Sequence, residues 1–160
     1  MILVLLGTQN NDFHRLLDEI EKNINQGNIN DEVIVQAGFT KYKSSQMQIF
    51  NMIPKNDLES LVKKADLIIT HAGLGSIEMS LEQGKKVIAV PRLKKYGEHV
   101  NDHQKDIENE YKKRGWIIGI DDVSELSAAL NEAKSFKPQK YVEPKRENMV
   151  NIIKTFIDKI

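Results

Sequence analysis

Short apolar runs that alternate with helix-patterned segments constrain the fold of this chain most strongly. The apolar runs are ILVLL (2–6), EVIVQA (32–37), QMQIF (46–50), DLIIT (66–70), KVIAV (86–90) and GWIIGI (115–120). The helix-patterned segments are 13–26, 55–64, 76–83, 102–113 and 124–133. Continuous apolar runs are typical of strands buried on both faces, and regular strand–helix alternation predicts a parallel sheet covered by helices. We therefore expect a single Rossmann-like, doubly wound α/β domain of about six strands.

The length of 160 residues favours one domain. We place that domain at residues 1–134, followed by an extended linker at 135–146 that contains two prolines and four basic residues. Residues 147–160 carry apolar side chains at helical spacing and predict a C-terminal amphipathic helix. Two interpretations of that helix stay open, because it can pack on its own domain or dock on a partner.

Composition excludes several classes of function. The 23 basic and 23 acidic residues balance to a net charge of zero, so we expect no nucleic-acid partner. The absence of cysteine excludes disulfides and thiolate chemistry and is compatible with a reducing cytoplasm. The opening MILVLLGTQ is too short for a signal peptide or a membrane span, so we interpret it as the first strand.

The loop GTQNNDFH (7–14) follows the first predicted strand. Gly7 allows a sharp turn, and Thr8 and Gln9 can donate hydrogen bonds to a ligand. The loop is not a GxGxxG motif, and no acidic residue ends the second strand to hold a ribose. A nicotinamide dinucleotide is therefore disfavoured.

The loop HAGLGS (71–76) follows the fourth predicted strand. Gly73 and Gly75 expose backbone N–H groups, and the following helix would add the positive end of its dipole, which together favour phosphate. The alternative is a ligand-free turn with Ser76 as the helix N-cap. His71 can close the loop or contact a phosphate.

The loop PRLKKYGEHVNDHQ (91–104) follows the fifth predicted strand and is long for its position. Its basic residues Arg92, Lys94 and Lys95 can neutralise phosphate charge. Its possible metal ligands are Glu98, His99, Asp102 and His103. Their spacing matches no closed metal site, so we expect no metal. His103 and Gln104 should present polar groups from the first turn of the next helix.

These three loops follow strands whose carboxyl ends meet at one edge of a parallel sheet, where ligands bind. The residues predict an anionic, hydroxyl-rich ligand, and a nucleotide with a diphosphate and a sugar fits that description.

The segment ADLIITHAGLGSIEMSLEQGKKVIAVPR, followed by NDHQ, resembles the donor-binding C-terminal half of family 28-type GT-B glycosyltransferases. The opening GTQNNDFHRLL resembles the small chain of split enzymes, in which a separate membrane-associated chain binds the acceptor. Split enzymes include the two-subunit UDP-GlcNAc transferase of asparagine-linked glycosylation and paired bacterial capsule or exopolysaccharide transferases. VPRLKKYGEHVNDHQ is most similar to the bacterial capsular group, and the resemblance covers most of residues 1–120.

The resemblance implies a set of donor-binding residues: Gly7, Thr8, Gln9, His71, Gly73, Gly75, Ser76, Glu78, Arg92, His103 and Gln104. Backbone around 7–9 and 73–76 would hold the diphosphate, Arg92 would lie near it, and Gln104 would bind sugar hydroxyls. The family commonly places a ribose-binding glutamate where this chain has Met79. Glu78 lies one position earlier, which turns a helical side chain by about 100°. We expect Glu78 to take over the ribose contact.

The resemblance also implies a function. It is that of a UDP-sugar-binding catalytic subunit of a two-component enzyme, which transfers a hexose, with a lean toward galactose, to a lipid-linked acceptor in polysaccharide biosynthesis. UDP-sugar would be the donor substrate, with no cofactor. The general base would come from a membrane-associated partner subunit, with His14 and His71 as local candidates. The chain would be cytoplasmic and held at the inner face of the membrane by that partner.

Two alternatives remain. A non-catalytic subunit that binds a sugar nucleotide and enhances a partner would show the same motifs. A stand-alone sugar-nucleotide epimerase is disfavoured, because such enzymes need two domains.

Overall fold

The computed structural model describes residues 1–144, 151, 153–154 and 157. Within these residues, six parallel strands form one sheet in the order β3-β2-β1-β4-β5-β6. The strands are β1 (Ile2–Leu5), β2 (Val33–Gln36), β3 (Gln48–Phe50), β4 (Leu67–Thr70), β5 (Lys86–Ala89) and β6 (Ile118–Gly119). The predicted doubly wound α/β fold is confirmed.

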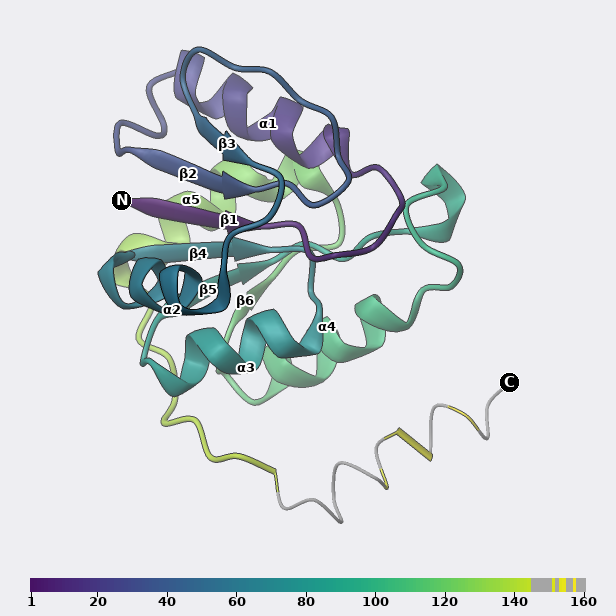
Figure 1. The fold of residues 1–160 in the computed structure, drawn as a ribbon. Coiled ribbons are helices and arrows are strands. Elements are labelled where there is room, and N and C mark those ends of the chain that lie inside the picture. The colour runs from purple at the N-terminus through teal and green to yellow at the C-terminus, as the bar shows by residue number, and fades with distance from the viewer. Residues whose placement is uncertain (145–150, 152, 155–156, 158–160) are drawn as a thin grey trace.

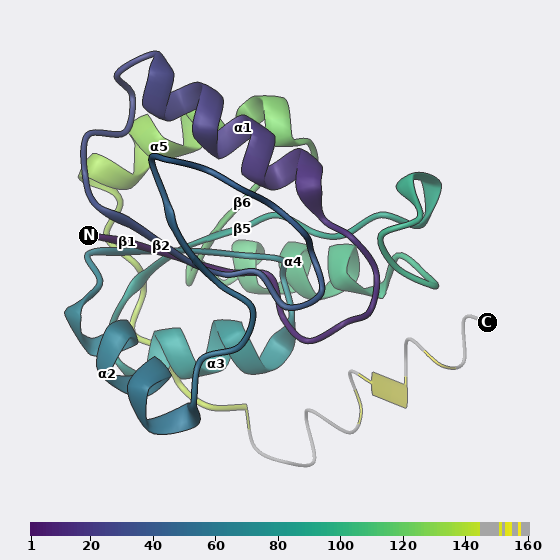
Figure 2. The ribbon, with the colours of Figure 1, turned by 45° about the horizontal axis from the view of Figure 1, so that its top comes forward.

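Helices cover both faces of the sheet (Figures 1 and 2). On one face lie α1 (His14–Asn25) and α5 (Leu126–Ser135). On the other lie α2 (Lys55–Lys64), α3 (Leu74–Glu82) and α4 (His103–Lys113). Two short 3-10 helices, η1 (Lys94–Tyr96) and η2 (Val123–Glu125), interrupt the loops before α4 and α5.

The continuous apolar runs follow from these two layers of helices. Side chains alternate between the faces of a strand, so both faces of a covered strand must be apolar. In β1, Val4 belongs to the cluster under α1 and α5, whereas Leu3 and Leu5 belong to the cluster under the other helices. All three are buried.

The direction of chain winding reverses between β1 and β4. These strands are neighbours in register, with Leu5 opposite Thr70, yet the chain leaves β1 toward α1 on one face and leaves β4 toward α3 on the other. The loops after the two strands therefore leave the carboxyl edge toward different faces, and we call the edge between them the crevice. This is the position at which open α/β sheets bind ligands.

Several element boundaries differ from the sequence prediction. Strand β6 is shorter than 115–120, because Gly115 takes a left-handed turn (φ 69°) after α4. Helix α3 begins at Leu74, two residues before the expected start. Asp122 caps the 3-10 helix η2: its side chain accepts from Ser124 N, and Glu125 completes the capping box.

The chain after α5 is anchored rather than free. Residues 136–144 form no helix or strand, but Gln139 N donates to Gly115 O at 2.9 Å and Tyr141 packs edge-on against Trp116. The predicted C-terminal helix at 147–160 lies mostly outside the described residues. Its described positions, 151, 153–154 and 157, are helical. In the described part of the chain, no helix combines the length and apolarity that crossing a membrane requires.

Candidate functional site

His71 joins the two loops of the crevice. Its backbone N–H donates to Leu5 O at 3.1 Å, and its ring Nδ1 donates to the same oxygen at 2.9 Å. An added Cβ on Gly7 would lie 2.5 Å from His71 Nε2, and one on Gly73 would also overlap the ring. The imidazole therefore lies between the two glycines, and both loops close on it only because neither glycine carries a side chain.

The His71 ring is neutral. Burial lowers its pKa to about 4, against the raising effect of the hydrogen bond to Leu5 O and with a smaller contribution from the charge of Arg92. Because Nδ1 carries the proton that Leu5 O accepts, Nε2 keeps a lone pair and cannot donate to a phosphate. His71 thus shapes the crevice, and its lowered pKa makes it a poor general base at neutral pH.

The N-terminus of α3 provides backbone donors at the crevice. Its N-cap is Gly73, and no side chain in the described residues caps it. The first intrahelical bond runs from Ile77 N to Gly73 O at 3.1 Å, so the N–H groups of Leu74, Gly75 and Ser76 have no intrahelical acceptor. These groups and the helix dipole favour an anion. The prediction of Ser76 as N-cap is wrong, because the helix starts two residues earlier.

The early start of α3 follows from a strained backbone at Ala72. This buried residue has φ 62°, a left-handed conformation that non-glycine residues seldom adopt. The turn lets the chain leave β4 and enter α3 directly after Gly73. Strained backbone of this kind concentrates at functional sites.

Gln104 lies in the first turn of α4 and is mostly buried. Its Oε1 accepts from Arg92 N at 3.1 Å, which fixes the plane of the amide and commits its oxygen. The NH₂ group is therefore the part of Gln104 that can serve a ligand. Neighbouring His103 begins α4 with its own N–H bonded to Asn101 Oδ1, and Thr8 and Gln9 are exposed in the loop after β1.

Arg92 does not fit a direct contact with pyrophosphate. Its side chain is fully buried, and its guanidinium donates to backbone carbonyls: Nη2 to Leu6 O at 2.7 Å and Nη1 to Asn11 O at 2.6 Å. The guanidinium carbon Cζ lies 5.0 Å from the centroid of the Phe13 ring and stacks over its face. Burial lowers its pKa to about 10, which leaves it charged at neutral pH. The structure thus corrects the expected role of Arg92.

Glu78 does not replace the family's ribose-binding glutamate. Its Oε1 accepts from Tyr111 OH at 3.0 Å and from Tyr141 OH at 3.3 Å. Met79, at the family's glutamate position, packs against the core under α3 and α4. The one-residue displacement turns the carboxylate toward the tyrosines, and neither residue presents a carboxylate to the crevice.

The remaining polar residues are committed to local contacts. His14 Nδ1 lies 3.1 Å from Asp12 Oδ2, and its Nε2 lies 3.7 Å from Asp18 Oδ2. Asp102 Oδ1 accepts from Lys94 N at 2.8 Å. Among the residues that the structure describes, no group of three or more histidines and carboxylates could hold a metal ion.

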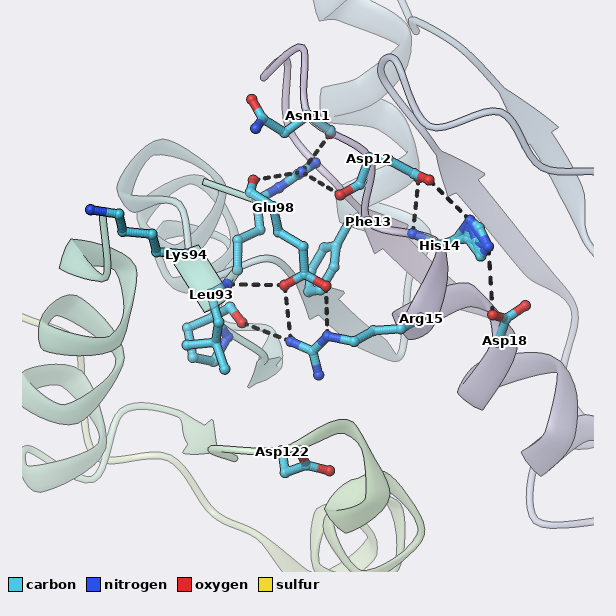
Figure 3. A network of polar contacts seen from close by, with 12 residues as sticks. Asn11, Asp12, Phe13, His14, Arg15, Asp18, Leu93, Lys94, Glu98 and Asp122 are labelled. Carbon is cyan, nitrogen blue, oxygen red and sulfur yellow. Dashed lines mark hydrogen bonds and ion pairs between the residues drawn. The ribbon is translucent and has the colours of Figure 1, made fainter. Parts of the chain in front are cut away.

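Sequence reasoning missed two features of this edge. Glu98 is buried and paired with Arg15 of α1, beside Phe13 (Figure 3). Phe39 and Phe50, which lie just after β2 and at the end of β3, are about half exposed. The sequence did carry a signal for the exposed phenylalanines, because both are large apolar residues at or just beyond the end of a strand.

Comparison with known proteins adds to this geometry. The glycosyltransferase family 28 C-terminal domain matches residues 1–160. The chain belongs to this family. The family 28 chain is 31% identical over 124 residues to the UDP-N-acetylglucosamine transferase subunit ALG13 of Debaryomyces hansenii, covering 75% of this chain and 56% of that protein. It therefore spans about half the length of that curated relative.

Solved structures share the fold. The glycotransferase of kitacinnamycin superposes with a TM-score of 0.63 at 19% identity, covering 84% of this chain and 34% of that chain. The NMR solution structure of ALG13 gives a TM-score of 0.60 at 16% identity, covering 96% and 95%. These likenesses confirm the fold of the C-terminal half of a GT-B glycosyltransferase.

Proposed function

We propose that this chain is the UDP-sugar-binding catalytic subunit of a two-component glycosyltransferase, which transfers a hexose to a lipid-linked acceptor. The observation that carries the proposal is the crevice between β1 and β4. There the N-terminus of α3, which has no side-chain cap among the described residues, and the glycine loops around His71 offer a cluster of backbone donors. Such a cluster suits a diphosphate.

In this proposal the diphosphate lies against backbone of 7–9 and 73–76, including the Gly75 and Ser76 N–H groups. The NH₂ group of Gln104, with His103 beside it, binds hydroxyls of the donor sugar. Charge that develops on the UDP leaving group is stabilised by fixed N–H dipoles, which need no reorganisation during the reaction. No metal or cofactor is part of this chemistry.

The general base comes from the partner in this proposal. His71 is neutral with a lowered pKa, and its Nε2 faces two glycine loops. His14 lies between two aspartates at the start of α1. A base on the acceptor hydroxyl therefore belongs to a membrane-associated, acceptor-binding subunit, which would hold this chain at the cytoplasmic face of the membrane.

Docking to that subunit would use the C-terminal segment. Ile153 and Ile157 line an apolar pocket with α4 residues and remain about half exposed. Changing both to aspartate should abolish co-purification with the partner. Association that survives both changes would contradict this docking mode.

The donor is tested by calorimetric titration of this chain with UDP, UDP-galactose, UDP-glucose and UDP-N-acetylglucosamine. The similarity of VPRLKKYGEHVNDHQ to capsular enzymes favours galactose and a role in polysaccharide synthesis, whereas the Debaryomyces relative is named for N-acetylglucosamine. Failure of UDP and all three donors to bind would overturn the proposal.

The alternative is a non-catalytic subunit that binds a sugar nucleotide and enhances its partner. Gln104→Glu separates the two, because it keeps an acceptor for Arg92 N and removes the amide N–H donors. A catalytic subunit should lose most transfer in the reconstituted pair. Unchanged transfer with normal partner binding would favour the alternative.

A further inference from the structure

A group of charged side chains, of which Arg92 and Glu98 are buried and Arg15 is partly buried, joins the loop after β1 to the loop after β5 (Figure 3). We call Arg15, Arg92 and Glu98 the loop clamp. Both Glu98 oxygens accept from Arg15, at 2.6 Å from Nε and 3.0 Å from Nη2. Glu98 Oε2 also accepts from Leu93 N at 2.9 Å. Glu98 is 4% exposed, so its carboxylate is satisfied by these protein donors and not by bulk water.

The guanidinium of Arg92 completes the clamp. It reaches across from the end of β5 to carbonyls at both ends of the 6–11 segment, at Leu6 and Asn11. Its Nη1 also lies 3.3 Å from Glu98 O, so one group touches both loops. In the opposite direction, Asn11 Nδ2 of the first loop donates to Gly97 O of the second at 2.8 Å.

The clamp is an expensive way to stabilise a fold. Burying ions costs several kcal/mol each, and well-packed apolar residues are often as stable. Two clamp nitrogens, Arg15 Nη1 and Arg92 Nε, are buried without a partner among the described residues. What the clamp does supply is fixed geometry, because planar guanidinium groups hold their acceptors at set distances and angles.

The fixed geometry lies beside the crevice. The segment held by Arg92 contains Gly7, Thr8 and Gln9, and the backbone N–H of Arg92 orients the amide of Gln104. We propose that Arg92 and Glu98 are positioning residues. They hold the 7–9 backbone and Gln104 in the arrangement that receives a nucleoside diphosphate sugar, and they do not contact that ligand themselves. This inference rests on the proposed function.

The test compares Glu98→Gln with the wild type and with Asp121→Asn, which removes the carboxylate of an exposed ion pair with Lys105. Amide hydrogen exchange of residues 7–13 reports loop order without any ligand, and calorimetry with UDP reports binding. For Glu98→Gln we expect exchange in 7–13 and the Kd for UDP to rise roughly tenfold, with α3 amides unchanged. Saturating UDP should restore most of the loop protection, and Asp121→Asn should match the wild type.

Arg15→Lys provides a second variant if Glu98→Gln folds poorly. It keeps the charge but loses the paired geometry, so we expect a smaller change in the same direction. Unchanged exchange in 7–13 would overturn the inference, as would faster exchange with unchanged UDP affinity. If the wild type fails to bind UDP, the proposed function fails, and exchange still decides whether the clamp fixes the loop.

Discussion

The imidazole of His71 occupies the space beside Gly73 that a Cβ atom would need. Gly73 has an ordinary extended backbone, with φ −75° and ψ 132°, so its lack of a side chain matters for space and not for conformation. The ring is anchored at Leu5 O and cannot move aside without breaking that bond.

Gly73→Ala should therefore destabilise the protein and weaken UDP binding. We expect a loss of about 1–3 kcal/mol in the free energy of unfolding, which is typical of overpacking, measured by urea denaturation. Gly75→Ala is the matched control for stability, because nothing lies within 4 Å of the added Cβ and alanine favours the helix. Equal stability of the two variants would contradict the steric role of His71.

The neutral His71 should make the fold sensitive to acid. Its pKa is lowered to about 4 in the folded state from 6.5, so the unfolded chain takes up the proton first as the pH falls. The stabilisation that comes from neutral His71 is complete above pH 6.5. The free energy of unfolding then falls by about 3 kcal/mol as the pH drops from 6.5 through 4. His71→Asn keeps a donor for Leu5 O and should remove this slope from urea denaturation curves measured between pH 4 and 7. A slope that persists in the variant would assign it to other groups.

Glu108 should produce a pH dependence of the opposite sign. This buried carboxyl has both oxygens unpartnered among the described residues, and burial raises its pKa to about 6. Its stabilising protonated form is present below pH 4.5 and is lost as the pH rises through 6, at a cost of about 1–2 kcal/mol. The charged groups that face it are Lys105, Lys112, Asp121 and Glu125.

Glu108→Gln should flatten stability between pH 4.5 and 7 and make the protein more stable than the wild type at pH 8. The Glu108 carboxyl packs directly against Gly119, where an added Cβ would overlap it. A Gln variant with the wild-type pH profile would show that Glu108 is solvated or paired in solution.

Glu78→Gln should lower the stability of the fold and leave UDP binding nearly unchanged. Because the Glu78 carboxylate accepts from Tyr111 and Tyr141, we expect a loss of about 1 kcal/mol in stability with the Kd for UDP changed less than about twofold. Tyr141→Phe removes one of these bonds and should cost less. A tenfold loss of UDP affinity in Glu78→Gln would restore Glu78 as a ribose ligand.

The fold was predictable because its signals are local. The apolar run of β4 and the glycine loop after it place a binding edge without knowledge of the rest of the chain. The start of α3 was misplaced because the left-handed turn at Ala72 is a conformation that its residue type does not suggest. Arg92 was assigned to the diphosphate because a basic side chain can neutralise phosphate charge and because the resemblance places it near that group. Its burial depends on Phe13 and on carbonyls of a distant loop, which become neighbours only in the folded protein.

The hydrogen bond from Arg92 to Leu6 O also sets an order of assembly. The two residues are 86 positions apart, and Glu98 and Arg15 are 83 apart. The strand made first, β1, lies in the middle of the sheet and gains its second neighbour only when β4 has been made. Contacts between distant segments form late because closing long loops costs entropy. The edge that we propose for the donor should thus be among the last parts to mature, so a nascent chain that ends before residue 92 would leave the 7–9 loop unfastened even with β1 to β5 already made.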